Sequence, residues 1–392
     1  MDLRGPEPTY KGHYDVIVVG GGVAGVAAAV ASARANAKTL LIEKGVNLGG
    51  LATMGLISLY EPLCDGEGKQ MVYGIAEELV KLSMRYGFDN LHPKWGGNGH
   101  NKPKNERYTT RFSPGIFAAA LDDFVLKNGV ELKFDTLAAY PIMDNRKCIG
   151  LVTENLNGRE YYEAGAVVDA TGNASIIDRA KVPTVSGRSF MTYLVHLYEM
   201  EDAAELAENR DGNAFRKWAS WGANWAGEGN PEGVKVFEEA TAEELNEYMI
   251  IGKQNLLSRM EKLGKDNFDV MAIPNMPQMR TIRRIVGKVD FHAIDGETCQ
   301  DAIGWCGDFR PSGVGKHYQV PFGSLYNEAF PNLVAAGRII SAPQGDGWEV
   351  SRVIPVCVQT GEAAGKAAAL CAMKQLSMDK IREHYMEKIR IM

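Results

Sequence analysis

The stretch Tyr14-Asp-Val-Ile-Val-Val-Gly-Gly-Gly-Val-Ala-Gly25 decides the fold of this chain. Four β-branched residues at 16–19 predict a short buried strand, and this run stops at a glycine cluster. Gly20, Gly22 and Gly25 fit the pattern G-x-G-x-x-G. In that pattern the first glycine allows a tight turn and the second lets a diphosphate approach the backbone. The third lets the following helix pack closely on the strand.

The next residues complete a βαβ unit. Residues 23–36 are mostly Ala and Val and predict a helix whose N-terminus would face the diphosphate. A second strand at 39–42 ends in Glu43, an offset of 43 − 20 = 23 residues from Gly20. An acidic residue about 20 residues after the motif meets the adenosine ribose in such sites. The context therefore favours a dinucleotide half-site over a glycine-rich turn without a ligand.

Composition narrows the class of protein. A chain of 392 residues predicts two subdomains, and a net charge of −6 gives no electrostatic case for nucleic acid or an anionic membrane. The uncharged run 16–33 is interpreted as a buried βα unit rather than a signal peptide or membrane span, because it holds three consecutive glycines.

Cysteines and histidines give no sign of a metal or dithiol centre. The six cysteines contain no C-x-x-C pair, and scattered cysteines suit a reducing cytoplasm. The histidines show no ligand spacing. His92 and His100 flank a glycine-rich loop at 92–105, but a metal site there is disfavoured.

Later segments extend the predicted sheet. The loop 44–55 holds Gly49, Gly50 and Gly55, which would let backbone pass close to a flat ring or a diphosphate, with a plain surface loop as the alternative. Strands are expected at 131–134, 148–154 and 161–170, with Asn157-Gly158 as a hairpin signal. One βαβ unit, a meander, and a return strand that ends in Ala170-Thr-Gly172 form a layout typical of FAD rather than NAD binding. Helices are predicted at 70–87 and 114–128.

The central region 187–330 has a different character and is a candidate second domain. A strand is expected at 190–200 and acidic helices at 201–217 and 238–263. Trp218, Trp221 and Trp225 would share one helical face, either in the core or lining a substrate pocket.

Two groups in this region are candidates for chemistry. Arg280 and Arg283 share a face if residues 279–287 are helical, and Arg280 and Arg284 then stand at i, i+4. These arginines either tie down a surface or clamp a carboxylate or carbonyl. His317, beside Tyr318, is the histidine to test first.

The C-terminal part of the chain predicts a second helix N-terminus lined by glycine and alanine, like the one that follows Gly20. A short strand at 331–338 ends in Gly337-Arg338, a loop follows at 341–351, and Pro355 opens a small-residue helix that runs to about 376. Two such helix N-termini suggest one long ligand that is contacted at both ends.

Five segments carry a family resemblance, namely 16–25, 43–55, 167–173, 280–287, and 332–338 taken with 352–365. In these the chain resembles FAD-dependent oxidoreductases of the glutathione-reductase-like flavoprotein superfamily. It is most similar to a large bacterial family in the branch shared with fumarate reductase and succinate dehydrogenase flavoproteins. The resemblance implies an α/β fold with a Rossmann-like FAD-binding domain, an inserted β-meander and a second α+β substrate domain. The expected division is a tail at 1–13, an FAD-binding domain at 14–186 plus 331–392, and a substrate-binding domain at 187–330.

The resemblance also implies which residues hold FAD. Glycines 20, 22 and 25 would hold the diphosphate, Glu43 the adenosine ribose, and a backbone position near Ala138 the adenine. The other expected cofactor-binding residues are Val23, Ala24, Lys44, Gly50, Leu51, Ala52, Thr53, Ala170, Thr171, Gly172, Gly337, Arg338, Val353 and Pro355. Covalent flavoproteins of this branch use a histidine in the loop after Glu43. Residues 45–55 contain none, so FAD is expected to be dissociable.

The predicted reaction is hydride transfer between a small-molecule substrate and flavin N5, with Arg280, Arg283, His317 and Arg352 orienting or protonating the substrate. The alternative is a fumarate- or enoate-reductase-like reduction of a C=C bond. A disulfide reductase, a monooxygenase and a halogenase are disfavoured because their signatures are missing. A non-enzymatic flavoprotein and a tRNA-modifying enzyme are disfavoured too. The expected setting is cytoplasmic, with an unidentified electron acceptor or donor, no nucleic acid or membrane partner, and a possible homo-oligomer.

Overall fold

The structure is a computed structural model that describes residues 7–95, 97, 108–209, 212, 216–224, 226–264 and 266–391. Its central sheet has seven strands in the order β5-β2-β1-β8-β7-β6, with β16 also paired to β8. The bounds are β1 Thr9–Val19, β2 Thr39–Ile42, β5 Glu131–Lys133, β6 Leu137–Asp144, β7 Lys147–Asn155, β8 Gly158–Asp169 and β16 Leu333–Ala335.

This sheet combines a parallel part with a meander. β1 runs parallel to β2 and β8, β2 parallel to β5, and β16 parallel to β8. β7 runs antiparallel to both β6 and β8. The predicted Rossmann-type α/β fold class is therefore confirmed, and the strands at 137–169 form the expected meander.

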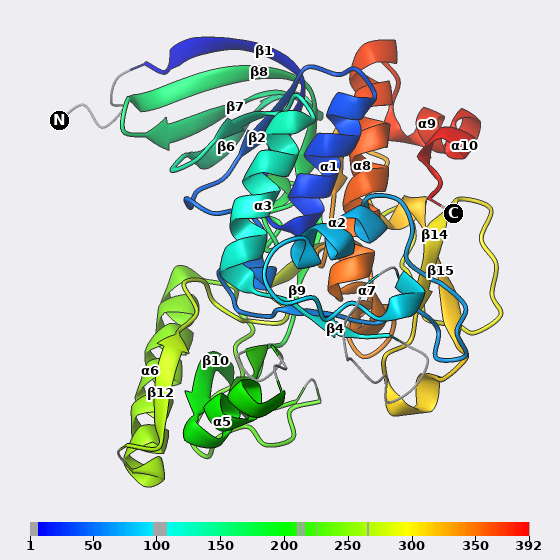
Figure 1. Cartoon of the computed structure of the whole chain (residues 1–392). Helices are drawn as coiled ribbons and strands as arrows, with labels where there is room; N and C mark the ends of the chain where they lie inside the picture. Colours follow the sequence, from blue (N-terminus) through cyan, green and yellow to red (C-terminus); the bar gives the residue numbers. More distant parts are fainter. Residues whose placement is uncertain are drawn as a thin grey trace.

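The apolar run of β1 is buried on both faces of the sheet. Val16 and Val18 pack in one core cluster with α1 (Val23–Arg34) and α8 (Ile354–Lys374), whereas Ile17 and Val19 belong to a second cluster. Successive side chains of a strand point to opposite faces, so a strand covered on both sides reads as a continuous hydrophobic run. Figure 1 shows α1, α8 and α3 (Pro114–Lys127) together over one face of the sheet.

Helices α1 and α8 approach each other through small residues. A Cβ added at Gly361 would lie 2.1 Å from the carbonyl oxygen of Ala24, and one added at Gly365 would lie 2.1 Å from that of Ala28. Ser32 Oγ donates to the carbonyl of Gly365 at 3.1 Å. The Ala- and Gly-rich composition of both helices therefore permits backbone-to-backbone contact.

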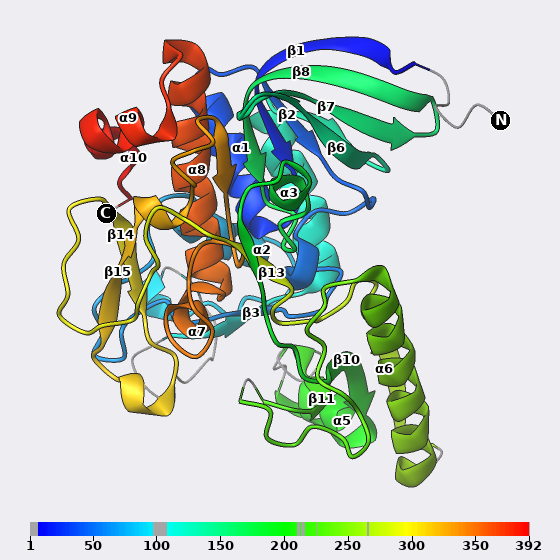
Figure 2. The same cartoon turned by 180° about the vertical axis from the view of Figure 1, so that it is seen from behind.

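A second, smaller sheet is built from residues 192–272. Its strands β10 (Thr192–Glu199), β11 (Trp218–Gly222) and β12 (Phe268–Ala272) lie in the order β11-β10-β12. Helix α6 (Ala242–Leu263) packs on it, with Tyr193 and Tyr248 in one buried cluster. Figure 1 and Figure 2 both show α5 (Met200–Asn209), α6 and these strands grouped apart from the central sheet.

The hairpin of β14 (Ala302–Gly307) and β15 (His317–Pro321) packs differently. Ile303 and Tyr318 belong to the same buried cluster as α1 and α8, not to the cluster around Tyr193. Ile285 and Phe330 belong to the cluster that holds Ile17, so residues of the predicted second domain divide among three buried clusters.

The tryptophan prediction is wrong, because residues 218–222 form strand β11 instead of a helix. Trp221 packs against Tyr193 with ring centroids 5.3 Å apart, while the guanidinium of Arg111 lies 4.4 Å from the ring centroid of Trp218. The two tryptophans thus face opposite sides of the sheet. Aromatic residues favour strands, and the i, i+3 spacing misled the helix assignment. Trp225 lies outside the described residues.

Three other segments differ from the secondary structure that was predicted for them. Residues 283–285 form β13 (Arg283–Ile285), antiparallel to β9 (Thr184–Ser186), so the arginines share no helical face. The expected loop 341–351 contains helix α7 (Gly347–Ser351). The expected tail is strand from Thr9 onward, because β1 extends along β8. Most of the loop 92–105, with His100, lies outside the described residues.

The remaining elements are short connections and helices. Helix α2 begins at Ile75, later than the predicted residue 70, and α5 ends at Asn209, before the predicted residue 217. Among the described residues, no helix is both long and apolar enough to cross a membrane. The bounds are η1 Gly50–Ala52, β3 Leu59–Tyr60, α2 Ile75–Met84, η2 Pro93–Trp95, β4 Thr110–Arg111, α4 Ser175–Arg179, η4 Pro311–Gly313, η5 Phe322–Ser324, α9 Met378–His384 and α10 Met386–Ile389.

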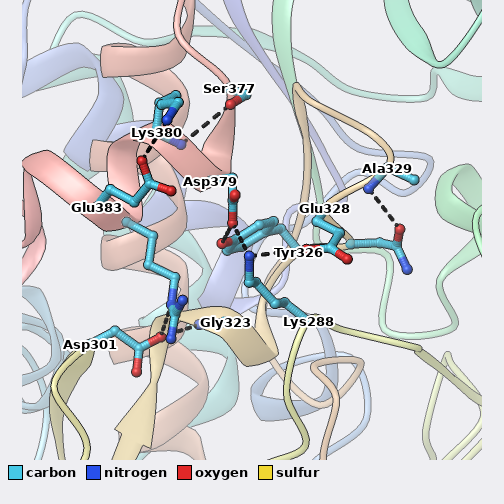
Figure 3. A network of polar contacts seen from close by, with 12 residues as sticks. Lys288, Asp301, Gly323, Tyr326, Glu328, Ala329, Ser377, Asp379, Lys380 and Glu383 are labelled. Carbon is cyan, nitrogen blue, oxygen red and sulfur yellow. Dashed lines mark hydrogen bonds and ion pairs between the residues drawn. The ribbon is translucent and has the colours of Figure 1, made fainter.

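A polar network fixes helix α9, near the C-terminus, to the body of the protein (Figure 3). Asp379 on α9 accepts hydrogen bonds from Lys288 Nζ and from Tyr326 Oη, the latter at 2.8 Å. Arg382 Nε donates to Asp301 at 2.6 Å, and Asp301 also accepts from the backbone N–H of Gly323 at 2.9 Å. These contacts join segments that are far apart in the sequence.

The variant Asp379→Asn tests this network through pH. The hydrogen bond from Lys288 holds the pKa of Asp379 below its ordinary value. A depressed folded-state pKa adds stability above the unfolded-state pKa of about 4, and this stability is lost as the pH falls through the folded-state value. We expect the variant to lose about 1–3 kcal/mol of unfolding free energy at pH 7. In urea titrations this deficit should shrink as the pH falls below the unfolded-state pKa of about 4. A deficit that does not shrink below this pH would contradict the assignment.

Candidate functional site

A cavity of about 480 Å³ lies where β1, β2 and β8 end. Ligands of open α/β sheets bind at these carboxyl ends. The volume falls in the range of 300–1,000 Å³ that is usual for cofactor and ligand sites. Most of its lining comes from residues within 19–179 and 336–357, which include the starts of α1 and α8.

The glycine turn after β1 forms one wall. Gly20 has φ +98°, and its N–H donates to the carbonyl of Ile42 at 2.8 Å. A Cβ at Gly25 would lie 1.8 Å from the carbonyl oxygen of Gly20, so Gly25 closes the turn against the helix. Gly22 caps α1 without a side-chain hydrogen bond, and a Cβ there would meet no atom within 4 Å. The open space thus lies in front of uncapped N–H groups at the start of α1.

Glu43 ends β2 at the edge of the cavity. Its Oε2 accepts from the N–H of Gly21 at 2.6 Å and its Oε1 from that of Gly45 at 2.7 Å. Each carboxylate oxygen keeps a further acceptor site, because an ionised carboxylate offers about four. The N–H groups of Gly21 and Gly45 therefore fix the carboxylate of Glu43 while leaving it able to accept a hydrogen bond from a hydroxyl group.

The segment after Glu43 returns to the glycine turn. The N–H of Gly49 donates to the carbonyl of Gly21 at 2.8 Å, and Gly49 forms a parallel bridge with Gly22. Thr53 is buried, and its Oγ1 donates to the carbonyl of Leu48 at 2.6 Å. Thr53 thus holds the loop together and does not line the cavity, whereas Gly50 does.

The end of β8 forms a third wall. Asp169 is fully buried and accepts hydrogen bonds from the N–H groups of Thr171, Ile176 and Ile177. This fixes the turn Ala170–Gly172 and the start of α4. Burial raises the pKa of Asp169, against the lowering effect of these donors.

The start of α8 forms the opposite end. Ile354 and Cys357 line the cavity, and α8 has no side-chain cap. Gly337 has φ +79°, and its N–H donates to Thr360 Oγ1 at 3.0 Å. Burial raises the pKa of Cys357 to about 12, so this thiol is neutral at physiological pH. Both uncapped helix N-termini, of α1 and α8, therefore meet the same cavity.

Arg338 joins two segments at this end. Its Nε donates to the carbonyl of Gly172 at 2.8 Å and its Nη1 to that of Met279 at 2.6 Å. Burial lowers the pKa of Arg338 to about 10, which leaves the guanidinium charged at pH 7. It lines the main cavity and also a smaller one beside it, of about 120 Å³.

Most predicted cofactor residues line the main cavity, and four do not. Gly25, Thr53, Val353 and Pro355 are not among the residues that line it. Those that line it are Gly20, Gly22, Val23, Ala24, Glu43, Lys44, Gly50, Leu51, Ala52, Ala138, Ala170, Thr171, Gly172, Gly337 and Arg338.

The predicted catalytic residues separate into three places. Arg352 lines the main cavity, and Arg280 and Arg283 line the smaller one. His317 lines neither; on β15 it lies beside Lys69, at 3.2 Å from Nε2 to Nζ, and packs on Trp305. The structure therefore does not bring His317 to the candidate site.

Sequence reasoning missed the segment 275–277, between β12 and β13. Asn275, Met276 and Pro277 line the main cavity, and the N–H of Asn275 donates to the carbonyl of Met54 at 2.8 Å. The two prolines at 274 and 277 could have marked it as a rigid loop.

The residues that line the main cavity fit FAD. The uncapped start of α1 and the open space at Gly22 suit a diphosphate, and Glu43 suits the ribose hydroxyls. Residues 136–138 also line the cavity, as do Ile354 and Cys357 at the start of α8. Among the described residues, no group of three His, Cys, Asp or Glu could hold a metal ion.

Comparisons with known proteins agree with this fit. Over 184 residues the chain is 29% identical to glutathione reductase of Yarrowia lipolytica (strain CLIB 122 / E 150), which is 45% of this chain and 35% of that protein. It is 33% identical over 78 residues to thioredoxin reductase of Bacillus subtilis (strain 168), 20% of this chain and 25% of that one. The chain thus matches only about a third or less of these two reductases.

A solved structure shows a similar fold over almost the whole chain. The flavin-dependent brominase has a TM-score of 0.51 and 14% identity, with 96% of this chain and 84% of the other covered. At this identity the likeness concerns the fold alone. The family model described as FAD dependent oxidoreductase matches residues 15–214 and 216–390. The chain therefore belongs to the FAD dependent oxidoreductase family, an enzyme family that uses FAD.

Proposed function

We propose that this chain binds FAD non-covalently in the 480 Å³ cavity and transfers a hydride between a carbon of a small-molecule substrate and flavin N5. When bound, FAD supplies the two-electron acceptor or donor. The observation that carries the proposal is that two uncapped helix N-termini, of α1 and α8, open into one cavity beside Glu43. Non-covalent binding is supported by the lack of histidine in residues 45–55.

Different residues of the chain would bind different parts of FAD. Backbone N–H groups at Gly22 and Val23 would donate to the diphosphate, and Glu43 would accept from the ribose. A helix N-terminus stabilises negative charge by about 0.3–2 kcal/mol. The start of α8 would give this stabilisation to charge that develops at the ring end, where Ile354 and Cys357 line the cavity.

Arg352 is the candidate to orient the substrate at that end. Its guanidinium lies 5.0 Å from the ring centroid of Trp348 and 5.5 Å from that of Phe309, and its Nε lies 3.6 Å from Glu349 Oε2. Burial lowers the pKa of Arg352, and Glu349 opposes this effect. Stacking and the ion pair thus fix a half-buried cation at the cavity wall.

The division into domains is also a proposal. Residues 14–186 and 331–392 supply most walls of the FAD cavity, and 275–277 reach it from the region 187–330. We infer that the part around the small sheet covers the substrate, and that 291–326, which shares the main core, belongs with the FAD side.

Reduction of an activated C=C bond is the second candidate, because the same cavity serves electron flow in either direction. The fumarate reductase branch, a bacterial and cytoplasmic origin, an electron partner and a homo-oligomer all stay predictions. Nucleic acid and membrane partners are not proposed, in line with the net charge of −6.

Anaerobic reduction tests the direction of the reaction. We expect purified protein to show flavin absorbance and to bleach when the right donor is present in a pool of hydroxy acids, amines and sugars. A C=C reductase would instead show no bleaching by donors, and its chemically reduced flavin would be reoxidised by an activated alkene. Protein that folds yet neither carries nor takes up FAD would refute both candidates.

The variant Arg352→Gln tests the substrate-orienting role. We expect FAD to stay bound and flavin reduction by the identified substrate to slow at least ~10-fold, because a charged hydrogen bond contributes about 1.5–3 kcal/mol. Arg352→Lys should recover part of the rate by keeping the charge. Arg146→Gln, in the exposed turn between β6 and β7, is the matched control and should match wild type. A wild-type rate in Arg352→Gln with full FAD content would exclude the role.

A further inference from the structure

The smaller cavity, of about 120 Å³, directly adjoins the main one, because Gly172 and Arg338 line both. Its other walls come from the paired strands β9 and β13 and from the loop at 342–344. Figure 2 shows β13 at the point where the chain passes between the small sheet and the main body. The cavity is thus placed to receive one end of a molecule whose other end lies in the main cavity.

The charged residues that line this cavity are all arginines. Arg280, Arg283, Arg284 and Arg338 contribute to it, and in the part of the chain that the structure describes no acidic side chain lines it. A volume of about 120 Å³ holds several water-sized groups, so a small polar group fits.

Nearby carboxylates balance only part of this charge. Arg283 Nη1 lies 3.4 Å from Asp178 Oδ2, and Arg284 Nη1 lies 2.9 Å from Asp290 Oδ1. Arg338 bonds to neutral carbonyls, as described above.

Arg280 has no ion pair within 4 Å among the described residues. Glu349, the acidic group whose field reaches Arg280, is paired with Arg352. Among the described residues, the guanidinium groups of Arg280 and Arg338 are therefore left without a carboxylate partner of their own.

Arg280 is the least satisfied of the four. Its Nη1 is fully buried and has no hydrogen-bond partner in the part of the chain that the structure describes. Burial lowers the pKa of Arg280, and the field of Arg352 lowers it further. A buried donor without an acceptor is costly, and so is a buried charge without a counterion. An anion in the cavity, bound by the rest of the guanidinium, would supply the missing counterion.

We propose that the arginine-lined cavity binds a carboxylate of the substrate, with Arg280 as its main partner. A planar guanidinium matches a carboxylate through two parallel N–H donors. Arg283 and Arg284 are already committed to aspartates and Arg338 to carbonyls, so one available guanidinium favours a monoanionic carboxylate over a dianionic phosphate. This inference rests on the proposed hydride-transfer function and narrows its substrates to carboxylic acids with the reacting carbon in the main cavity.

Acetate is the probe for the site, in FAD-loaded protein at constant ionic strength. We expect acetate to perturb the flavin absorbance spectrum saturably, and inorganic phosphate to do so more weakly. Arg280→Gln should weaken acetate at least tenfold, with partial recovery in Arg280→Lys. Arg188→Gln removes an exposed arginine that pairs with Glu238, and should bind acetate as wild type does. FAD content measured for each variant shows that the fold is kept.

Three outcomes would overturn the proposal: no saturable acetate effect, equal acetate affinity in wild type and Arg280→Gln, or tighter binding of phosphate than of acetate. The donor screen separates this proposal from the proposed function. Donors that bleach the flavin equally well as free acids and as neutral amides would refute the carboxylate site and leave hydride transfer standing. Saturable, Arg280-dependent acetate binding without bleaching by any donor would support the site and count against hydride transfer.

Discussion

Gly25→Ala is expected to destabilise the protein and to weaken FAD binding at least ~10-fold, whereas Gly22→Ala should weaken FAD to a similar degree without destabilising the apoprotein. The two glycines belong to one motif but meet different surroundings. A Cβ at Gly25 would lie 1.8 Å from the Gly20 carbonyl oxygen, so the turn itself must shift. Such overpacking costs about 1–3 kcal/mol. A Cβ at Gly22 meets no protein atom within 4 Å, and φ is −62°, which alanine adopts freely.

The space in front of Gly22 is where the diphosphate is expected, so a methyl group there would collide with the ligand and not with the chain. Urea unfolding of the apoproteins measures the first effect, and titration with FAD followed by flavin fluorescence measures the second. Normal FAD affinity in Gly22→Ala would place the diphosphate elsewhere. Normal stability in Gly25→Ala would mean that the turn tolerates a wider separation of β1 and α1.

The dinucleotide half of the fold could be predicted because its signals are local. Residues 16–25 and Glu43 lie close in sequence, and the turn geometry at Gly20 and Gly25 demands glycine. The hairpin at Asn157 and the proline-initiated helix α8 are equally local. Such features follow from backbone sterics, which a sequence displays directly.

The substrate side could not be predicted in the same way, because its geometry depends on pairing between distant segments. Arg280 and Arg283 seemed to share a helical face, but residues 283–285 pair with β9, about 100 residues earlier in the chain. Residues 275–277 reach the cavity only because Asn275 hydrogen-bonds to Met54.

The location of His317 also depends on the tertiary fold and could not be predicted from the sequence. From the sequence, His317 beside Tyr318 was the histidine to test first for a role in orienting or protonating the substrate. In the fold, β15 pairs with β14 and places His317 against Trp305 and Lys69. The nature of a residue thus indicated possible chemistry, while its location required the tertiary fold.

Gly365→Ala is expected to cost about 1–3 kcal/mol of unfolding free energy, although alanine favours a helix by about 1 kcal/mol over glycine. The reason is the contact between α8 and α1, where the added Cβ would lie 2.1 Å from the carbonyl oxygen of Ala28. Backbone cannot rotate out of the way as a side chain can, so the helices must separate. Separation would also stretch the hydrogen bond from Ser32 Oγ to the Gly365 carbonyl.

Gly115→Ala is the matched control, since Gly115 also lies in a helix, α3, and a Cβ there meets nothing within 4 Å. It should leave stability unchanged or raise it by up to ~1 kcal/mol through helix propensity. Urea unfolding of both variants isolates the packing cost, because the propensity gain is common to the two. Equal stability of the two variants would show that α1 and α8 separate without cost. The start of α8 would then not be fixed against α1, and its alignment with the FAD cavity would need another cause.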